Sequence, residues 1–352
     1  MKKKVAVAMS GGVDSSLCAA LLQEQGYEVL GITMRLSDDS REMNGVSSAA
    51  TDARRVADFL GIEHVVADFR TLFSDKVVDY FLTEYLTART PNPCVICNRF
   101  LKFGELLSFA REKGADFLAT GHYVRVEKEE DGSFALKKGR DEKKDQSYVL
   151  YRLPREILSH ILFPLGSYRK EETRALAQKL SLPVANKAES QEICFVPEDD
   201  YKAYLSQHRP NRFHTGDIVD MQGQILGQHR GLPFYTIGQR KGLGIAAAHP
   251  LYVIALDEAN NRVIVGKNEE LYASSLFASD VNWLMEEPTQ EISVHAKIRY
   301  GSREVKANVL PLEDGTVKVS FLEPQRAVTP GQSVVFYSGE RLVGGATIES
   351  RT

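Results

Sequence analysis

Short apolar runs alternate with amphipathic segments over the first half of the chain. The apolar runs have the length of buried strands and cover residues 5–9, 29–34, 65–67 and 117–120. The intervening and following segments repeat apolar residues at helical spacing over residues 13–25, 52–60, 76–88, 101–113 and 171–180. Strands that alternate with helices predict an α/β domain built on a parallel, doubly wound sheet.

The pattern changes near residue 204. Beyond this point short strands and turns replace the helices, as in residues 216–219, 223–226 and 252–255. From about residue 278 to the end the chain shows only short alternating strands, which predicts a small β-barrel. We therefore expect three domains: a catalytic domain over residues 1–203, a small central domain over 204–275, and the barrel over 276–352.

Two connecting segments have a recognisable local character. Residues 124–127 and 134–137 flank Asp131-Gly132, a dipeptide typical of tight hairpin turns. Residues 37–48 are polar and contain glycine, so we expect a mobile loop there.

The most informative stretch is Ser10-Gly11-Gly12-Val13-Asp14-Ser15-Ser16, which joins the first strand to the first helix. Glycines allow the backbone to approach a ligand, and the N–H groups at a helix N-terminus can bind phosphate oxygens. The stretch lacks the Lys of the common P-loop and the glycine spacing of dinucleotide-binding folds. It is either a structural tight turn or a different kind of phosphate-binding loop.

Three segments that could contribute to a ligand site lie at the ends of predicted strands. The glycine turn follows the first strand, Met34 ends the second, and Gly121-His122 follows the fourth. In doubly wound sheets ligands bind outside the carboxyl ends of the strands. We therefore expect these segments to form one site, although His122 on its own could equally be a hydrogen-bonded core histidine.

Composition limits the classes of protein that need consideration. The chain has 352 residues, 43% of them hydrophobic, which is enough for two or three domains with their own cores. A net charge of -3 excludes a uniformly basic surface but not a confined basic face. There is no apolar run of membrane-spanning length and no signal-peptide core, so we expect a cytoplasmic protein.

The four cysteines suggest chemistry as well as packing. Cys18 lies within the first helix pattern and is interpreted as a core residue. Cys94 and Cys97 follow a loop with two prolines, and Cys194 lies far along the chain in a strand-like segment. We expect Cys97 near a helix start, where the helix dipole, Arg99 and Lys102 would lower its thiol pKa.

Three interpretations of Cys94, Cys97 and Cys194 remain open at this point. They could be buried small hydrophobic residues, although loops that contain prolines are usually exposed. They could hold a metal ion or an iron–sulfur cluster, for which they supply three ligands rather than the usual four. Cys97 and Cys194 could instead form a working pair in sulfur chemistry.

Several further motifs complete a pattern that spans nearly the whole chain. They occur at residues 10–16, 90–93, 97–98, 119–123, 144–148, 193–195, 238–244 and 329–332. Together and in this order they resemble the bacterial tRNA-specific 2-thiouridylases, whose first domain belongs to the PP-loop ATP pyrophosphatases. The resemblance implies an adenine nucleotide alpha hydrolase-like fold. It also implies exchange of oxygen for sulfur at C2 of the wobble uridine, position 34, of tRNA.

The resemblance assigns a nucleotide site and a sulfur chemistry. In the family, ATP adenylates the uridine oxygen, with Mg²⁺ expected, and AMP and pyrophosphate leave. Cys194 would carry a persulfide, and Cys97 would be the nucleophile that releases its sulfur and forms a disulfide with Cys194. A cysteine desulfurase or a sulfur relay protein would be the sulfur donor. The residues that would contact ATP are Ala8, Met9, Ser10, Gly11, Gly12, Val13, Asp14, Ser15, Met34 and Gly121.

The resemblance also implies contacts with the anticodon arm of tRNA. The residues concerned are Asn92, Pro93, Cys94, His122, Lys144, Asp145, Gln146, Arg299, Tyr300 and Gln332. We expect residues 238–244 to meet the tRNA backbone, because no strand precedes them as one would in a phosphate-binding loop.

One position departs from the family pattern. Relatives commonly carry an acidic residue where this chain has Cys94. The departure leaves an iron–sulfur cluster on Cys94, Cys97 and Cys194 as a second route for sulfur. Two further functions stay compatible with the sequence: a different adenylating PP-loop ligase, and an RNA-binding protein without turnover.

Overall fold

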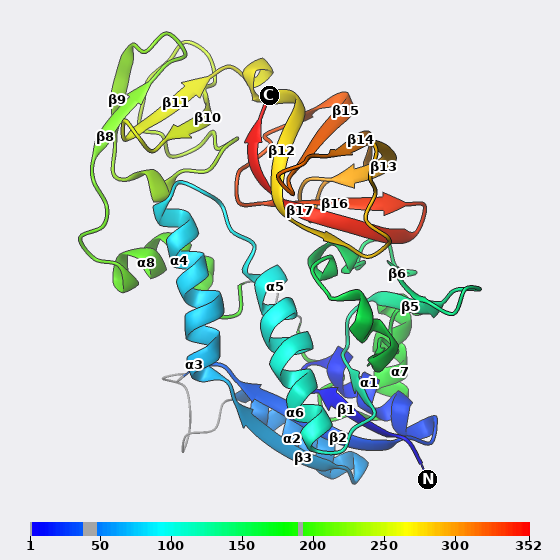
Figure 1. Ribbon diagram of the computed structural model, residues 1–352. Coiled ribbons are helices and arrows are strands. Elements are labelled where there is room, and N and C mark those ends of the chain that lie inside the picture. The colour runs from blue at the N-terminus through cyan, green and yellow to red at the C-terminus, as the bar shows by residue number, and fades with distance from the viewer. Residues whose placement is uncertain (1, 38–47, 189–192) are drawn as a thin grey trace. The chain divides into compact units, whose positions relative to one another are not determined.

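A computed structural model describes residues 2–37, 48–188 and 193–352 (Figure 1). The expected loop at residues 37–48 falls almost entirely outside the described residues. The chain divides into two compact units, each of which is described separately. Unit 1 comprises residues 1–77, 94–191 and 339–343, and unit 2 comprises residues 78–93, 192–338 and 344–352.

A five-stranded parallel sheet forms the centre of unit 1, in the order β3-β2-β1-β4-β7. Its strands are β1 (Lys4–Ala8), β2 (Glu28–Arg35), β3 (Glu63–Asp68), β4 (Phe117–Ala119) and β7 (Ile161–Leu162). The strand order runs outward from β1 in both directions, which is the doubly wound arrangement predicted from the sequence. Such a sheet has its topological switch point beside β1, and a ligand site is expected at that edge.

The helices of unit 1 connect these strands. They are α1 (Val13–Glu24), α2 (Ser48–Leu60), α3 (Arg70–Phe73), α5 (Pro93–Ile96, which begins in unit 2), α6 (Leu106–Glu112) and α7 (Lys170–Lys179). Wider π-helical turns precede α4 (Asp79–Leu86) and α6, at Ser74–Val78 and Cys97–Glu105, and 3-10 turns occur at Ser147–Leu150 and Arg155–His160. The helix predicted over residues 76–88 therefore begins as a π-helix and ends at Leu86.

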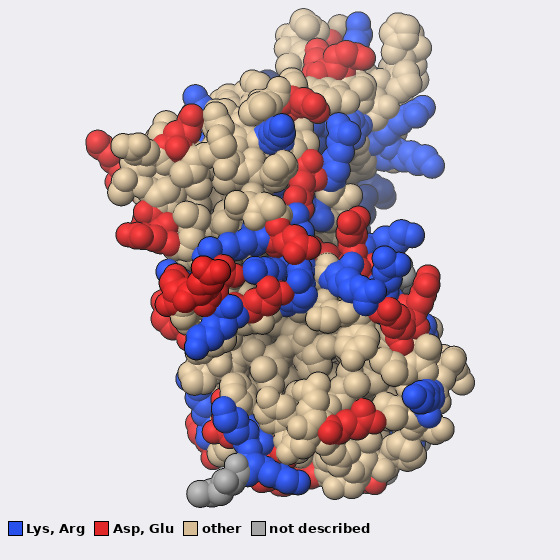
Figure 2. All heavy atoms as spheres, turned by 90° about the vertical axis from the view of Figure 1, so that its right-hand side faces the viewer, with Lys and Arg blue, Asp and Glu red and all other residues tan. Residues whose placement is uncertain are grey.

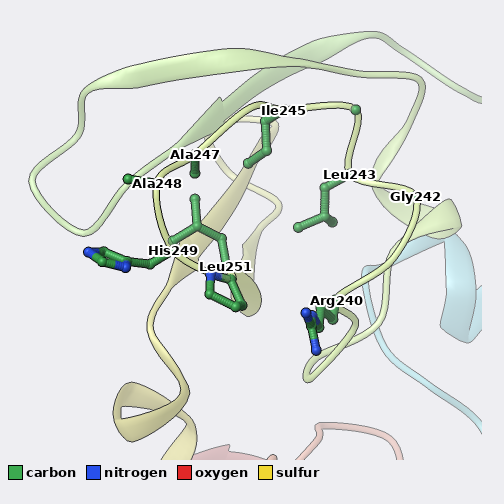
Figure 3. A pocket seen from close by; sticks show the side chains of 10 residues that line it. Arg240, Gly242, Leu243, Ile245, Ala247, Ala248, His249 and Leu251 are labelled. Carbon is green, nitrogen blue, oxygen red and sulfur yellow. The ribbon is translucent and has the colours of Figure 1, made fainter.

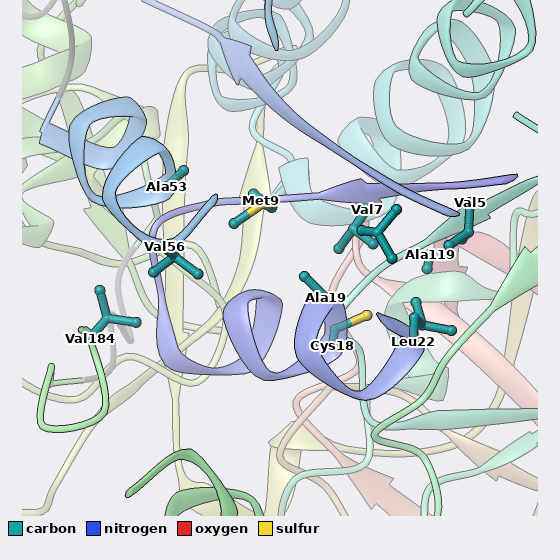
Figure 4. Packing of buried hydrophobic residues seen from close by; sticks show 11 residues of the cluster. Val5, Val7, Met9, Cys18, Ala19, Leu22, Ala53, Val56, Ala119 and Val184 are labelled. Atoms are coloured by element: carbon teal, nitrogen blue, oxygen red, sulfur yellow. The ribbon is translucent and has the colours of Figure 1, made fainter. Parts of the chain in front are cut away.

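One apolar cluster fixes α1 and α2 against the central strand. Figure 4 shows Cys18, Ala19 and Leu22 of α1 beside Val5 and Val7 of β1. All five side chains are fully buried or nearly so. The interpretation of Cys18 as a core residue is therefore confirmed. This packing holds the start of α1, and the glycine turn before it, in a fixed place relative to the sheet.

A hairpin completes unit 1. It consists of β5 (Val124–Lys128) and β6 (Phe134–Lys138), which pair antiparallel across the predicted Asp131-Gly132 turn. Strand β6 also pairs with Arg341, the first residue of β17 (Arg341–Arg351). Arg125 and Lys137 bind the carboxylate of Glu127 from two sides, which reinforces the hairpin.

The described residues of unit 2 form two complete helices and two β structures. The helices are α4 (Asp79–Leu86) and α8 (Tyr201–His208), with 3-10 turns at Pro197–Asp199, Leu232–Phe234 and Asn268–Leu271. A four-stranded sheet has the order β10-β11-β8-β9 and comprises β8 (Gly216–Val219), β9 (Ile225–His229), β10 (Tyr252–Asp257) and β11 (Arg262–Gly266). The remaining strands are β12 (Tyr272–Trp283), β13 (Ile292–Lys297), β14 (Val305–Pro311), β15 (Val317–Arg326), β16 (Ser333–Ser338) and β17 (Arg341–Arg351).

These last six strands close into an antiparallel barrel. They pair in the order β12-β15-β14-β13-β16-β17, and β12 pairs with β17 to complete the circle. Closure leaves no exposed sheet edge among the six strands, which stabilises a short all-β segment. The barrel predicted at the C-terminal end is confirmed. No helix of the described residues is long and apolar enough to cross a membrane.

Candidate functional site

The first glycine of the turn, Gly11, has a backbone conformation that favours glycine. Gly11 has a φ of +67°, in the left-handed region that disfavours side chains. A Cβ atom at Gly11 would also lie 2.5 Å from the carbonyl oxygen of Ala49 in α2. The turn therefore packs directly against the backbone at the start of α2.

Serine hydroxyls fix the rest of the turn. The hydroxyl of Ser15 accepts a hydrogen bond from the backbone N–H of Ser10 at 3.1 Å and donates to the carbonyl of Gly12 at 3.2 Å. The hydroxyl of Ser16 donates to the same carbonyl at 2.8 Å. Helix α1 then begins at Val13, and the first N–H groups of an α-helix have no partner within the helix. This arrangement is suited to binding an anion such as a phosphate.

A buried lysine neutralises the acidic residue of the turn. Nζ of Lys170, at the start of α7, donates to both carboxylate oxygens of Asp14 at 2.7 Å. The hydroxyl of Tyr123 also donates to Asp14 at 2.9 Å and lies 2.8 Å from the hydroxyl of Thr173. Without Lys170 the carboxylate would repel a phosphate bound at the start of α1.

A second lysine contacts the turn from another direction. Nζ of Lys187 donates to the carbonyl of Gly11 at 3.0 Å and to the carboxylate of Asp52 at 2.7 Å. Asp52 belongs to α2, so the contact joins three segments of unit 1 at the first glycine.

The predicted convergence of strand ends is present. Strand β1 pairs with β2 on one side and with β4 on the other, so the glycine turn, Met34 and Gly121 follow or end three adjacent strands. Gly121 approaches the turn closely, because a Cβ atom on it would lie 3.0 Å from the nitrogen of Ser15. The structure thus places the predicted ATP contacts at one edge of the sheet: Ala8, Met9, Ser10, Gly11, Gly12, Val13, Asp14, Ser15, Met34 and Gly121.

His122 lies at the same edge but is a buried residue. Its Nδ1 lies 2.7 Å from the hydroxyl of Thr120, and its ring packs near Phe103 and Phe163. Burial, and to a smaller extent Lys102, lowers the pKa of His122 well below its ordinary value. The ring is therefore neutral at physiological pH, and these contacts are those of a hydrogen-bonded core histidine.

The lowered pKa of His122 predicts an acid-sensitive fold. Below pH 6.5, the ordinary histidine pKa, the unfolded chain binds a proton that the folded chain does not, so stability is lost as pH falls. Between pH 7.5 and 5.5 we expect the wild type to lose about 1.4 kcal/mol more unfolding free energy than a His122→Gln variant. Urea unfolding of both proteins at the two pH values measures this difference. Equal losses would show that His122 does not titrate in this way.

Cys97 differs from the sequence-based expectation. The helix begins four residues earlier, at Pro93, and Cys97 starts the π-helical stretch Cys97–Glu105 as a buried residue. Burial raises the pKa of the Cys97 thiol, and this effect outweighs the lowering by Lys102. The prediction of a lowered pKa was wrong. Loss of solvation destabilises the thiolate more than the nearby Lys102 ammonium stabilises it.

The neighbouring residue Asn98 is also buried. Its Nδ2 donates to the carbonyl of Val149 at 3.0 Å, which ties the Cys97 helix to the 3-10 turn at Ser147–Leu150. This contact holds the backbone on which Cys97 lies.

The other two candidate cysteines are exposed. Cys94 lies in α5, and Cys194 lies in a turn rather than in the predicted strand-like segment. An aromatic cluster surrounds the Cys194 segment within unit 2, where Phe195 packs edge-on against Phe81 of α4 at 5.2 Å between ring centroids. Among the described residues, no three His, Cys, Asp or Glu side chains are grouped closely enough to hold a metal ion.

The differences in burial predict an order of reactivity toward an alkylating agent. At pH 7.5 we expect iodoacetamide to modify Cys94 and Cys194 at least about tenfold faster than Cys97 and Cys18. The reason is that burial both blocks access and raises the pKa of the Cys97 and Cys18 thiols. Mass spectrometry of peptides from a time course measures the four rates. Labelling of Cys97 at the rate of Cys94 would contradict the buried position.

Two of the predicted tRNA contacts in unit 1 have structural roles. The carboxylate of Asp145 accepts hydrogen bonds from the backbone of Gly139 and Ser147 and from the Ser147 hydroxyl. The side chain of Gln146 accepts from the backbone N–H of Tyr123 at 2.9 Å. Both residues therefore fix their own loop, and the half-buried Lys144 lies beside them.

In unit 2 the predicted tRNA contact Gln332 positions the loop that carries two others, Asn92 and Pro93. Nε2 of Gln332 donates to the carbonyl of Thr90 at 2.9 Å and lies 3.3 Å from that of Pro91, so it positions the loop that ends in Asn92 and Pro93. Arg299 donates to a backbone carbonyl within the barrel, at Arg326. Tyr300 is exposed, with Nζ of Lys297 5.7 Å from the centre of its ring.

A cavity of unit 2 lies in the loop that precedes β10. It has a volume of about 430 Å³ and is lined by residues of the segment 240–251, including Arg240, Leu243 and His249 (Figure 3). No strand leads into this loop, as expected from its sequence. The face drawn in Figure 2 carries Lys and Arg side chains beside Asp and Glu, which agrees with the near-neutral net charge.

Sequence reasoning missed the two lysines that contact the glycine turn. Lys170 precedes Glu171 and Glu172, and this run of charged residues predicts a solvent-exposed helix start. Lys187 lies in a segment with no regular pattern. Neither position carries a local signal, because each lysine meets the turn only after the chain has folded.

The sheet order and the glycine turn together define the class of protein. A doubly wound parallel sheet whose first strand leads into a Ser-Gly-Gly-x-Asp-Ser turn is a nucleotide-binding domain of the HUP type. A family model described as the tRNA methyl transferase HUP domain matches residues 3–198. A second model, described as the tRNA methyl transferase PRC-barrel domain, matches residues 202–267. A third, described as the aminomethyltransferase beta-barrel domain, matches residues 273–348.

Relatives match the whole chain. A protein of Caldanaerobacter subterraneus subsp. tengcongensis named tRNA-specific 2-thiouridylase MnmA 1 is 52% identical over 361 positions, which cover 100% of this chain and 99% of the relative. Proteins named tRNA-specific 2-thiouridylase MnmA from Carboxydothermus hydrogenoformans and Clostridium acetobutylicum are 51% and 46% identical, each over 99% of this chain and over 98% and 100% of the relative. The chain belongs to the tRNA-specific 2-thiouridylase family, which confirms the resemblance.

Proposed function

We propose that the protein catalyses ATP-dependent 2-thiolation of the wobble uridine, position 34, of tRNA. The observation that carries this proposal is the glycine turn at the switch point of the sheet, in a chain that matches thiouridylases over its full length. We also propose the domain limits expected from the sequence, with the catalytic domain over residues 1–203, the central domain over 204–275 and the barrel over 276–352.

The first step activates the uridine. A carbonyl oxygen is a poor leaving group, so the O2 atom attacks the α-phosphate of ATP, pyrophosphate leaves, and the oxygen later departs within AMP. The N–H groups at the start of α1 stabilise the charge on the phosphates. Mg²⁺ fits this step as a partner of the phosphates themselves, since Lys170 already engages both oxygens of Asp14.

The second step transfers sulfur. The terminal sulfur of a persulfide on Cys194 attacks C2 and displaces AMP, which leaves the uridine joined to Cys194 through a disulfide bond. The thiolate of Cys97 then attacks the sulfur of Cys194, so that the thiocarbonyl leaves with the transferred atom and a Cys97–Cys194 disulfide forms. A thiol reductant restores the two cysteines, and a sulfur-donor protein reloads Cys194.

Cys97 must become accessible for this step. Burial limits access to Cys97 and raises the pKa of its thiol, so Cys97 is less reactive than an exposed cysteine. We propose that binding of the tRNA, whose target base must leave its stack, changes the environment of the Cys97 helix. Asn92, which precedes this helix, and Pro93 and Cys94, which lie in its first turn, are the residues proposed to contact the base. His122, Lys144, Arg299 and Tyr300 are proposed as further tRNA contacts.

An iron–sulfur cluster is the second candidate for the sulfur step. Exposed Cys94 lies three residues from Cys97 on the same helical segment, and Cys194 would complete a three-cysteine set. In that route the cluster supplies chemistry for holding sulfide, and Cys194 carries no persulfide.

One experiment tests the function and separates the two routes. Protein purified without oxygen is assayed for iron and labile sulfide, then supplied with ATP, unmodified tRNA and a persulfide donor. We expect iron-free protein to form 2-thiouridine, AMP and pyrophosphate in equal amounts. Thiolation only in iron-loaded protein would establish the cluster route. AMP formation without 2-thiouridine would indicate a different adenylating ligase. Absence of ATP turnover would indicate an RNA-binding protein that is not an enzyme.

A substitution at Cys94 provides an internal comparison. A Cys94→Asp variant carries the acidic residue of many relatives and removes a cluster ligand. We expect it to keep thiolation activity on the persulfide route and to lose activity on the cluster route.

A further inference from the structure

Lys187 makes a contact with the backbone of the glycine turn that the proposed chemistry does not use. Its ammonium group donates to the carbonyl oxygen of Gly11 at 3.0 Å. The same group pairs with the carboxylate of Asp52 at 2.7 Å. Asp52 is in α2, close to Ala49, whose carbonyl oxygen packs against Gly11. The lysine therefore has one fixed anchor and one backbone target.

The geometry of the peptide bond gives this contact a consequence. The carbonyl of Gly11 and the N–H of Gly12 belong to one planar, trans peptide group, so they point in opposite directions. A contact that holds the oxygen toward Lys187 must hold the N–H of Gly12 away from Lys187. Because Gly12 is the residue that precedes the first turn of α1, its N–H is one of the groups able to face a bound phosphate.

The peptide between the two glycines is also the one most able to rotate. Neither Gly11 nor Gly12 has a side chain, so both the observed conformation and a flipped one are sterically open to this peptide. A flip would direct a carbonyl oxygen, rather than an N–H, toward the phosphate. The serine hydroxyls bond to the Gly12 carbonyl and to Ser10, and they leave the Gly11 carbonyl to Lys187.

We infer that Lys187 is a positioning residue, which locks the Gly11–Gly12 peptide in the orientation that binds the phosphates of ATP, with Asp52 as its anchor. The inference rests on the proposed function in that ATP is the ligand of the turn. Lys187 acts through the backbone and keeps its contact with Gly11 when ATP is bound.

Asp52 distinguishes this role from a direct contact between Lys187 and phosphate. If Lys187 bound phosphate itself, removal of the Asp52 charge would release it, and ATP would bind as tightly as before or more tightly. If Lys187 locks the peptide, removal of its anchor loosens the lock and ATP binds more weakly. The two roles therefore predict opposite signs for one substitution.

The test measures equilibrium binding of a non-hydrolysable ATP analogue to the full chain by calorimetry. For Lys187→Met we expect the Kd to rise about tenfold or more, as for loss of a hydrogen bond to a charged group. For Asp52→Asn we expect a rise of about two- to fivefold, as for a partly exposed ion pair. Lys187→Arg should recover part of the affinity. Lys179→Met, an exposed lysine at the end of α7, is the control and should leave the Kd unchanged.

Steady-state assays then separate positioning from a general loss of structure. We expect Lys187→Met to raise KM for ATP while KM for tRNA stays the same, with unchanged thermal unfolding for Asp52→Asn. Unchanged or tighter ATP binding by Asp52→Asn, or a Lys187→Met variant with wild-type affinity, would overturn the inference. Failure of the wild type to thiolate tRNA would count against the proposed function alone, because the analogue-binding comparison does not require sulfur transfer.

Discussion

Replacement of Cys97 or Cys194 by serine is expected to abolish the formation of 2-thiouridine while ATP-dependent release of pyrophosphate continues. A hydroxyl group can neither carry a persulfide sulfur nor attack one, so each variant should lose thiolation by on the order of 10³-fold or more. Activation joins the bound uridine to ATP at the nucleotide site of unit 1, and the glycine turn of that site contains neither cysteine. Thiolation is measured by mass spectrometry of nucleosides, and pyrophosphate by a coupled assay in the same reactions.

Cys18 provides the matched control. It is a buried core residue, so Cys18→Ala should cost about 1 kcal/mol of stability and keep thiolation. The persulfide route also predicts that the two serine variants differ, since Cys97→Ser can still accept sulfur on Cys194 from a donor protein. Full activity in either serine variant would exclude the sulfur step proposed here.

Substitution of Lys170 by methionine is expected to lower the stability of the fold and the affinity for ATP. In that variant, a second substitution of Asp14 by asparagine is expected to restore both. Lys170 is buried and pairs with both oxygens of Asp14, so its loss leaves a carboxylate without its main counter-charge beside the phosphate site. Because the Asp14 side chain is 30% exposed, breaking this pair should cost about 2 kcal/mol, less than for a fully buried pair. The remaining negative charge should also raise the Kd for ATP about tenfold or more.

The double variant Asp14→Asn with Lys170→Met removes the charge from both partners. Replacing a buried ion pair with neutral groups of similar size is often close to neutral, so this variant should recover most of the lost stability and affinity. Thermal unfolding and calorimetry of the wild type, both single variants and the double variant form one double-mutant cycle. Additive losses in the double variant would show that Lys170 contacts ATP directly rather than balancing Asp14.

The pattern of apolar residues predicted the elements that position the site. Short apolar runs fixed the strands β1, β2 and β4, because a strand buried on both faces has no polar positions along it. The glycines of the turn predicted a backbone that can approach a ligand closely. In the structure the turn packs against α2, because a Cβ atom at Gly11 would lie 2.5 Å from the carbonyl oxygen of Ala49. The closed barrel was predicted from alternation alone, since each strand buries one face.

The residues that tune the site could not be predicted from local sequence. The pKa of Cys97 depends on burial, and burial depends on how the Cys97 helix packs, so the expected lowering was wrong in sign. Asp145, Gln146 and Gln332 matched family motifs for tRNA contacts, yet their side chains also hold nearby backbone groups in place.

The sequence by itself determined the order of the main strands and helices and the place of the glycine turn, because these follow from residue type and local spacing. Only the tertiary structure decided which charges meet the turn. Lys170 and Lys187 lie far along the chain from Asp14 and Gly11, with sequence separations of 156 and 176. Electrostatic energy depends on distance in space, and the folded chain alone sets that distance.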